Sequence, residues 1–336
     1  MNIFRKPLLL LVSSLFISQA STAQEGLSVY SDYLTDNYYL IHPSMAGAAN
    51  CAKIRLTARQ QWTDNDKSPA LQTLSFNTKV GEKSGVGLIA FNDRNGNHSQ
   101  MGAKATYAHH INFSRSYYDL NQLSFGISAG VIQTTLDETG FGSEFDPIIN
   151  GGVEQKDVSV MADFGASYHY LEFYAHATVK NAFTTKSDIY SDIESDNLRK
   201  YLVSAGYVFG TFNNSGFSWE PSVLFQFTEK TNEKILDVNM KMYKEFDNGQ
   251  FFAGVSYRTA FEGAEYMKDL ESKKQYYHSV SPILGVKYKS MMIGYTYSHQ
   301  FGDVKFQKGG FHQLTLGFNF LCRDNNYKCN CPSVNY

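Results

Sequence analysis

A histidine and a serine stand side by side at His278 and Ser279, and together they are the first candidates for chemistry in the sequence. The pair invites comparison with phospholipases in which an imidazole activates a serine. Adjacent residues on a strand point to opposite faces, so an extended segment would keep these two side chains apart. We therefore interpret His278 as a structural residue rather than a general base.

The stretch Asp93 to Asn97 has the oxygen ligands of a calcium loop. However, its glycine stands at the fourth position of the stretch, whereas an EF-hand loop needs a glycine at the sixth position. A tight turn between two strands explains it better. The sequence contains neither a phosphate-binding loop nor a His-Glu-x-x-His zinc motif. We assign no catalytic residue, no metal ligand and no cofactor, and we expect that the chain is not an enzyme.

The first residues have the features of an export signal. Arg5 and Lys6 precede an apolar run from 8 to 17, and small residues follow as far as Ala23. A membrane helix needs roughly 20 apolar residues, so this run is too short to span. We predict a signal peptide over 1–23, cleaved after Ala23. Nucleic-acid binding has no support, because the net charge is only -2 and the Lys and Arg residues are scattered.

Strict alternation of apolar and polar residues is the main structural signal, and it indicates strands. In the last such segment, Leu314, Leu316 and Phe318 share one face and Thr315 and Gly317 the other. We predict about 14 strands, many of which match the roughly 9–11 residues that a tilted strand needs to cross a bilayer. They cover 52–62, 69–80, 84–93, 99–113, 121–137, 157–171, 172–180, 199–209, 217–228, 233–246, 250–260, 276–289, 291–301 and 311–320.

Composition and strand pattern also suit a secreted β-sandwich or propeller, and the connections separate these alternatives. Tight connections alternate with long polar ones over 138–156, 181–198, 261–275 and 302–310. Short periplasmic turns that alternate with long extracellular loops are typical of outer-membrane barrels. The fold class is therefore predicted as all-β, a transmembrane antiparallel β-barrel over 51–321 in the cell outer membrane.

Two short segments flank the predicted barrel. Residues 24–50 show little alternation, and two interpretations stay open: they cross or plug the lumen, or they form a loose periplasmic lead-in. Residues 322–336 form a Cys-containing periplasmic tail. Charged residues that fall on inward positions of the predicted strands are Lys53, Arg55, Arg59, Glu220, Asp237 and Lys241. Inward charges of this kind more often form salt bridges with one another than line a selective pore.

Closure of an even-stranded barrel pairs the first strand with the last, antiparallel. Cys51 opens the first strand and Cys322 follows the last, so we predict a disulfide between them at the periplasmic rim. An exported protein sits in an oxidising compartment, which favours such a bond. Two alternatives remain: Cys329 or Cys331 competes for Cys51, or the thiols stay free or mixed.

Several blocks along the chain are similar to the PorP/SprF family of the type IX secretion system, found in gliding and periodontal Bacteroidetes. His42 to Gly47 resembles its Asn-Pro-Ala-x-Ala-Gly, residues 59–62 its Arg-x-Gln-Trp, and residues 311–318 its closing strand. His42, Ser44 and Gln313 depart from the family's Asn, Ala and Glu. The matching motif positions are Pro43, Ala46, Gly47, Arg59, Gln61, Trp62 and His312.

This resemblance implies an outer-membrane barrel that assists export of type IX cargo, adhesins in particular. Its expected partners are type IX secretion components, the lipid bilayer, and a secreted adhesin that is held through its C-terminal domain. A passive channel or solute transporter is the alternative, since a barrel of this size can enclose a conduit. We expect little steady conductance, with the N-terminal segment and inward Lys and Arg side chains filling the lumen.

Overall fold

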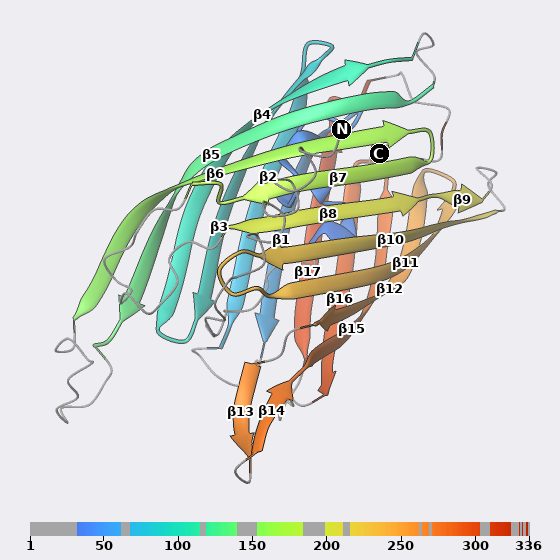
Figure 1. The fold of residues 1–336 in the computed structure, drawn as a ribbon. Helices are drawn as coiled ribbons and strands as arrows, with labels where there is room; N and C mark the ends of the chain where they lie inside the picture. Colours follow the sequence, from blue (N-terminus) through green and yellow to red (C-terminus); the bar gives the residue numbers. More distant parts are fainter. Residues whose placement is uncertain are drawn as a thin grey trace, which may run out of the picture.

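The computed structural model describes residues 32–61, 68–114, 119–139, 153–183, 199–210, 216–261, 264–268, 271–302 and 310–323, together with residues 329, 331 and 334. Within these residues no helix is long and apolar enough to cross a membrane. Nearly all of them belong to one antiparallel sheet, which is closed on itself (Figure 1).

The sheet is a ring of fourteen strands, as predicted. β8 and β9 count as one strand of the ring, because both pair with β10 and β9 continues the course of β8. The ring consists of β1 (Ala52–Gln61), β2 (Ala70–Val80), β3 (Ser84–Asn95), β4 (His98–Asn112), β5 (Asn121–Asp137), β6 (Glu154–Tyr170), β7 (Phe173–Lys180), β8 (Lys200–Tyr207) with β9 (Phe209–Gly210), β10 (Phe217–Thr228), β11 (Lys234–Phe246), β12 (Gly249–Ala260), β15 (Tyr277–Tyr288), β16 (Met291–Gly302) and β17 (Phe311–Phe320). β13 (Ala264–Lys268) and β14 (Glu271–Gln275) form a separate hairpin.

The first and last strands close the ring. β1 pairs with β17 antiparallel from Ala52 opposite Phe320 to Gln61 opposite Phe311. Just outside this ladder Cys51 and Cys322 form a disulfide, with their Cα atoms 4.0 Å apart, which confirms the predicted bond. Cys329 and Cys331 are bonded to each other instead of competing for Cys51. The seam is therefore held by hydrogen bonds along its length and by one covalent bond at its periplasmic end.

Each strand has an apolar outward face and a mostly polar inward face. On β1, Leu56 is 47% exposed while its neighbours Arg55 and Thr57 are 1% and 0% exposed. On β17, Leu314, Leu316 and Phe318 are the exposed residues and Thr315 is buried. Both patterns are as predicted, and they place an apolar band on the outside of the ring, where a bilayer lies.

The two ends of the barrel differ as the sequence predicts. The tight turns at one end contain residues with positive φ, namely Gly81, Leu171, Asn248 and Lys289. The opposite end carries the long connections, and one of them adds the β13–β14 hairpin to a stretch predicted as loop. β3 also runs further than predicted, to Asn95, so Asp93 lies within a ladder. This ladder and the two-residue turn at Gly96 and Asn97 support the turn interpretation over a calcium loop.

The described residues of the C-terminal tail return to the periplasmic end. Cys329, Cys331 and Val334 are buried in a small apolar cluster with Leu120, against which Leu171 packs. The Asn50 amide donates to the Val334 carbonyl at 2.9 Å. The tail therefore contacts both the periplasmic turns and the residue that precedes the seam disulfide.

Replacing Cys51 with Ser should lower the thermal unfolding midpoint without preventing barrel formation. The bond joins residues 271 apart in sequence, and loss of such a cross-link costs roughly 2–4 kcal/mol. The seam ladder remains in the variant. Heat-modifiable gel mobility with and without reductant would measure this, and Cys329→Ser is the matched control. The prediction is wrong if reductant leaves the wild-type midpoint unchanged.

Candidate functional site: the occupied lumen

Residues 32–50 lie inside the barrel, and we call them the lumen segment. They form three short 3-10 turns, η2 (Asp32–Thr35), η3 (Tyr38–Leu40) and η4 (Pro43–Met45), which appear in blue behind the strands in Figure 1. Their side chains form the main buried cluster together with inward residues of the surrounding wall, such as Tyr174 and Phe252. The lumen at this level is filled by the chain itself.

Glycines on the inner wall allow the lumen segment to approach the sheet backbone. A Cβ at Gly126 on β5 would overlap the backbone of Pro43, and one at Gly165 on β6 would lie 3.0 Å from the Pro43 ring. A Cβ at Gly85 on β3 would overlap the Ala46 carbonyl. Any larger residue at these positions would push η4 and the residues after it away from the wall.

Gly47 shows the same close fit from the side of the lumen segment. Its φ is +66°, a conformation that favours glycine, and a Cβ there would lie 2.6 Å from the Thr78 carbonyl oxygen. Its amide donates to Asn77 Oδ1 at 3.1 Å. The preceding Ala46 carbonyl is 3.0 Å from His110 Nε2. The Ala46-Gly47 pair of the family motif therefore attaches the backbone of the lumen segment to the wall.

Asp36 anchors the first half of the lumen segment by charge. Its carboxylate lies 2.9 Å from Lys287 Nζ, 3.4 Å from Lys53 Nζ and 3.8 Å from Arg55 Nη2. Burial alone would raise the pKa of Asp36, but the three cations outweigh it and hold the pKa at about 2. One carboxylate of the lumen segment thus binds cations from β1 and β15.

Tyr38 joins a second charged group. Its hydroxyl donates to Glu220 Oε1 at 2.9 Å, and Tyr174 and Tyr243 donate to the same carboxylate. Lys241 Nζ pairs with Glu220 Oε2 at 3.0 Å. A buried carboxylate is tolerated when a cation and hydrogen bonds compensate for its lost hydration. Glu220 on β10 therefore ties the lumen segment to β7 and β11.

Tyr33 makes the third polar attachment. Its hydroxyl donates to Asp237 Oδ2 at 2.9 Å, and Arg258 binds both oxygens of that carboxylate at 2.6 and 2.7 Å. Asn239 Nδ2 in turn donates to the Tyr33 hydroxyl at 3.1 Å. Two separate charged groups of the wall, around Asp237 and Glu220, thus accept hydrogen bonds from tyrosines of one short segment.

His42 lies among hydroxyl groups and other histidines. Its ring nitrogens are 2.8 Å from Thr178 Oγ1 and 3.0 Å from Ser204 Oγ, and its ring stacks on His176 with centroids 4.6 Å apart. Burial, with a smaller contribution from Lys180, lowers the pKa of His42 from 6.5 to about 3. Within the described residues no group of His, Cys, Asp or Glu is arranged to hold a metal ion.

The candidate catalytic residues have structural contacts instead. His278 Nδ1 lies 3.0 Å from the Tyr257 hydroxyl and 3.1 Å from Thr259 Oγ1, while Ser279 points inward and is buried. The segment 126–130 also has the Gly-x-Ser-x-Gly spacing of serine hydrolases. It lies in the middle of β5, where the Ser128 hydroxyl is 2.7 Å from Thr106 Oγ1, and not on a strand-to-helix turn.

The family-motif residues fall into two groups of contacts. Pro43, Ala46 and Gly47 belong to the lumen segment, whereas Arg59, Gln61 and His312 lie at the external end of the seam. There, the Arg59 guanidinium lies 4.0 Å over the Phe311 ring, and His312 Nδ1 is 2.7 Å from the Tyr295 hydroxyl. Trp62 lies outside the described residues.

The sequence did not identify several residues of the site, namely Tyr33, Asp36, Tyr38 and the inward glycines. For the glycines, their positions within predicted strands were a usable signal.

Comparison with known proteins gives one family. The model of the family described as type IX secretion system membrane protein PorP/SprF matches residues 22–318, which confirms the resemblance seen in the sequence. No curated protein matches the chain.

Solved structures with a similar chain path include three barrels. They are the CymD monoaromatic hydrocarbon channel (13% identity, 88% of this chain and 94% of that chain, TM-score 0.43), a mutant of the TodX monoaromatic hydrocarbon channel (12%, 84% and 92%, 0.45) and BamA from Haemophilus ducreyi (10%, 80% and 70%, 0.38). These likenesses are too distant to carry an argument about function.

Replacing Gly126 with Val should loosen the lumen segment. The new side chain would meet Pro43, and overpacking of this kind costs roughly 1–3 kcal/mol. We expect faster protease cleavage within residues 32–50 and a higher conductance in planar bilayers than that of the wild type. Ala129→Val, on the outer face of the same strand, is the control and should behave as wild type. Equal protection of both variants would contradict the contact.

Acidification should release the lumen segment. Unfolded His42 binds a proton near pH 6.5 but the buried ring does so only near pH 3, so its contribution to stability is complete above pH 6.5 and is lost as the pH falls toward 3. Protease cleavage within residues 32–50 should therefore rise between pH 7 and pH 5. The rise should be shallower in His42→Asn, which keeps hydrogen-bonding groups but cannot take up the proton. An identical pH profile in the variant would exclude His42 as the cause.

Proposed function

Because this chain belongs to the PorP/SprF family of type IX secretion system membrane proteins, we propose that it assists the export or surface anchoring of a secreted adhesin through the adhesin's C-terminal domain. The family membership associates the chain with the secretion system and with the outer membrane. The adhesin and the mode of its recognition are our proposal. The observation that carries it is the filled lumen, since a barrel closed by its own residues is suited to holding a partner at its rim.

The external end offers a surface for such a partner. The β13–β14 hairpin projects beyond the rim of the barrel, at the bottom of Figure 1. Its strands pair with each other and, among the described residues, with no further strand. Each strand therefore has a backbone edge to which an extended segment of another chain can add by main-chain hydrogen bonds. This supports recognition of an adhesin segment at the hairpin.

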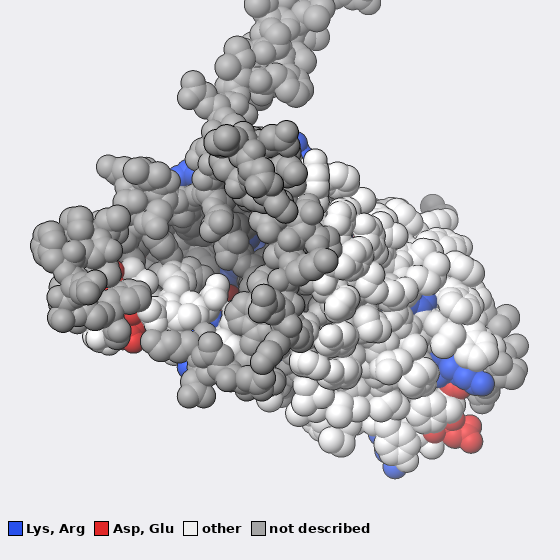
Figure 2. Space-filling model, turned by 90° about the horizontal axis from the view of Figure 1, so that it is seen from below, with Lys and Arg blue, Asp and Glu red and all other residues white. Residues whose placement is uncertain are grey.

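Charge is distributed unevenly around the same end. Figure 2 views the molecule from below Figure 1: blue and red side chains lie inside the opening, whereas most of the described outer wall on the right is white. The uncharged wall fits the hydrocarbon of the bilayer.

A passive channel or solute transporter is the second candidate. The size of the ring supports it, because fourteen strands can enclose a conduit. The lumen segment argues against it, because three turns with buried side chains occupy the interior. A stable open pore formed by the purified wild-type protein in planar bilayers would favour the channel.

The proposal predicts that a large secreted adhesin copurifies with the chain from gently solubilised outer membranes. Replacing residues 264–275 by a short Gly-Ser turn should reduce recovery of the adhesin about tenfold if the hairpin contributes about 1.4 kcal/mol to binding. The barrel should still show heat-modifiable mobility, because the hairpin is not part of the ring. Ala58→Phe, on the outer face of β1, is the control. Wild-type material that brings down no secreted protein would refute the anchoring role.

A further inference from the structure

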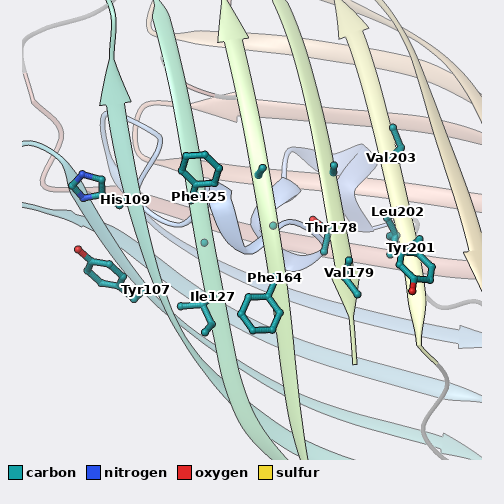
Figure 3. A pocket seen from close by; sticks show the side chains of 14 residues that line it. Tyr107, His109, Phe125, Ile127, Phe164, Thr178, Val179, Tyr201, Leu202 and Val203 are labelled. Atoms are coloured by element: carbon teal, nitrogen blue, oxygen red, sulfur yellow. The ribbon is translucent and has the colours of Figure 1, made fainter. Parts of the chain in front are cut away.

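A groove crosses the outer face of the barrel over strands β4 to β8, with a cavity of about 600 Å³. Figure 3 shows it from outside the wall, with the lumen segment behind the strands. The side chains that reach the lipid side are almost all apolar. They are Tyr107, His109, Phe125, Ile127, Phe164 and Val203, with Ala166 and Ala177 between them.

Two neighbouring cross-strand rows build this groove. One row runs from Tyr107 through Ile127, Phe164 and Val179 to Tyr201. The other runs from His109 through Phe125, Ala166 and Ala177 to Val203. The two alanines in the middle of the second row leave space between larger side chains. The groove is therefore a depression caused by small residues in the bilayer-facing surface.

The periplasmic end of the groove is polar. His109 lies three residues before the end of β4 and pairs with Ser84, the first residue of β3. The Ser84 hydroxyl is 3.0 Å from the Tyr107 hydroxyl. Lys83 and Glu82, in the turn that precedes Ser84, are both exposed. Hydroxyl, imidazole, ammonium and carboxylate groups thus lie where the groove meets the periplasmic interface.

The opposite end of the groove has different chemistry. Tyr201 lies one residue after the start of β8, and its hydroxyl donates to Glu229 at 3.4 Å. Arg199 Nη1 pairs with the same carboxylate at 3.0 Å. Arg199 is therefore already neutralised by a carboxylate, whereas Lys83 at the periplasmic end is exposed, so we place the phosphate at the periplasmic end.

We propose that this groove binds one phospholipid of the periplasmic leaflet. An acyl chain lies along the two rows over Ala166 and Ala177, and the phosphate lies at the periplasmic end, near Lys83, Ser84 and His109. The groove opens onto the hydrocarbon region, where lipid is the solvent, and its apolar body ends on the periplasmic side at an exposed lysine and hydroxyl groups, which match the acyl chains and the phosphate of a phospholipid. This lipid is held at a defined place and is distinct from the freely exchanging annulus.

Native mass spectrometry of the full chain, extracted in mild detergent and supplied with a single phospholipid species, tests the proposal. The wild type should retain one phospholipid per chain. Ala177→Phe, which fills the groove, should lower the bound fraction about tenfold, equivalent to about 1.4 kcal/mol. Ala58→Phe, on the outer face of the opposite wall, should retain the lipid as the wild type does. Heat-modifiable mobility confirms that each variant has formed a barrel.

A second pair of measurements tests the polar end. The double variant Lys83→Ala, His109→Ala should lose phospholipid severalfold while its retention of an uncharged diacylglycerol stays as in the wild type. Equal phospholipid retention by the wild type and Ala177→Phe would overturn the proposal. So would a membrane protein that copurifies with the wild type, is lost in Ala177→Phe and leaves no lipid adduct, because it would show that a protein occupies the groove.

Discussion

In a hydrocarbon environment every backbone N–H and C=O group needs a partner within the protein, and this requirement determines the architecture of the chain. An open sheet would leave two unpaired edges, so the ladder between β1 and β17 is the contact on which all others depend. The Cys51–Cys322 bond lies directly beside that ladder and holds the first and last strands of the barrel together. The outward apolar faces then follow, because alternation gives each closed strand one side toward lipid.

Closure creates a second requirement, which is to fill or hydrate the interior. The inward faces of a fourteen-stranded ring carry charges that would be costly if unpaired. Here the lumen segment supplies one carboxylate, Asp36, and tyrosine hydroxyls at Tyr33 and Tyr38, while the wall supplies the remaining partners. Inward glycines make room for its backbone. The wall and the segment thus provide partners for several of each other's buried charges and hydroxyl groups, which makes the filled state a specific structure.

The sequence predicts the wall better than its contents. Alternation along β1, β16 and β17 predicts both faces of each strand, because a period of two depends only on local geometry. The lumen segment has no such period: its 3-10 turns are stabilised by contacts such as Tyr38 with Glu220, residues that lie 182 positions apart. The sequence did not predict the β13–β14 hairpin, because it lies in a polar stretch that is typical of a loop. The outer groove was not predicted either, because it depends on the relative register of five strands.

The wall between the lumen segment and the outer groove is a single layer of backbone at Gly126 and Gly165. Pro43 presses on these glycines from inside, and the same two residues line the groove outside. No side chain cushions this part of the sheet on its inner face. Changes in bilayer thickness or lateral pressure that flatten or bend β5 and β6 would therefore displace η4 directly. The mechanical state of the membrane is in this way coupled to the interior of the barrel.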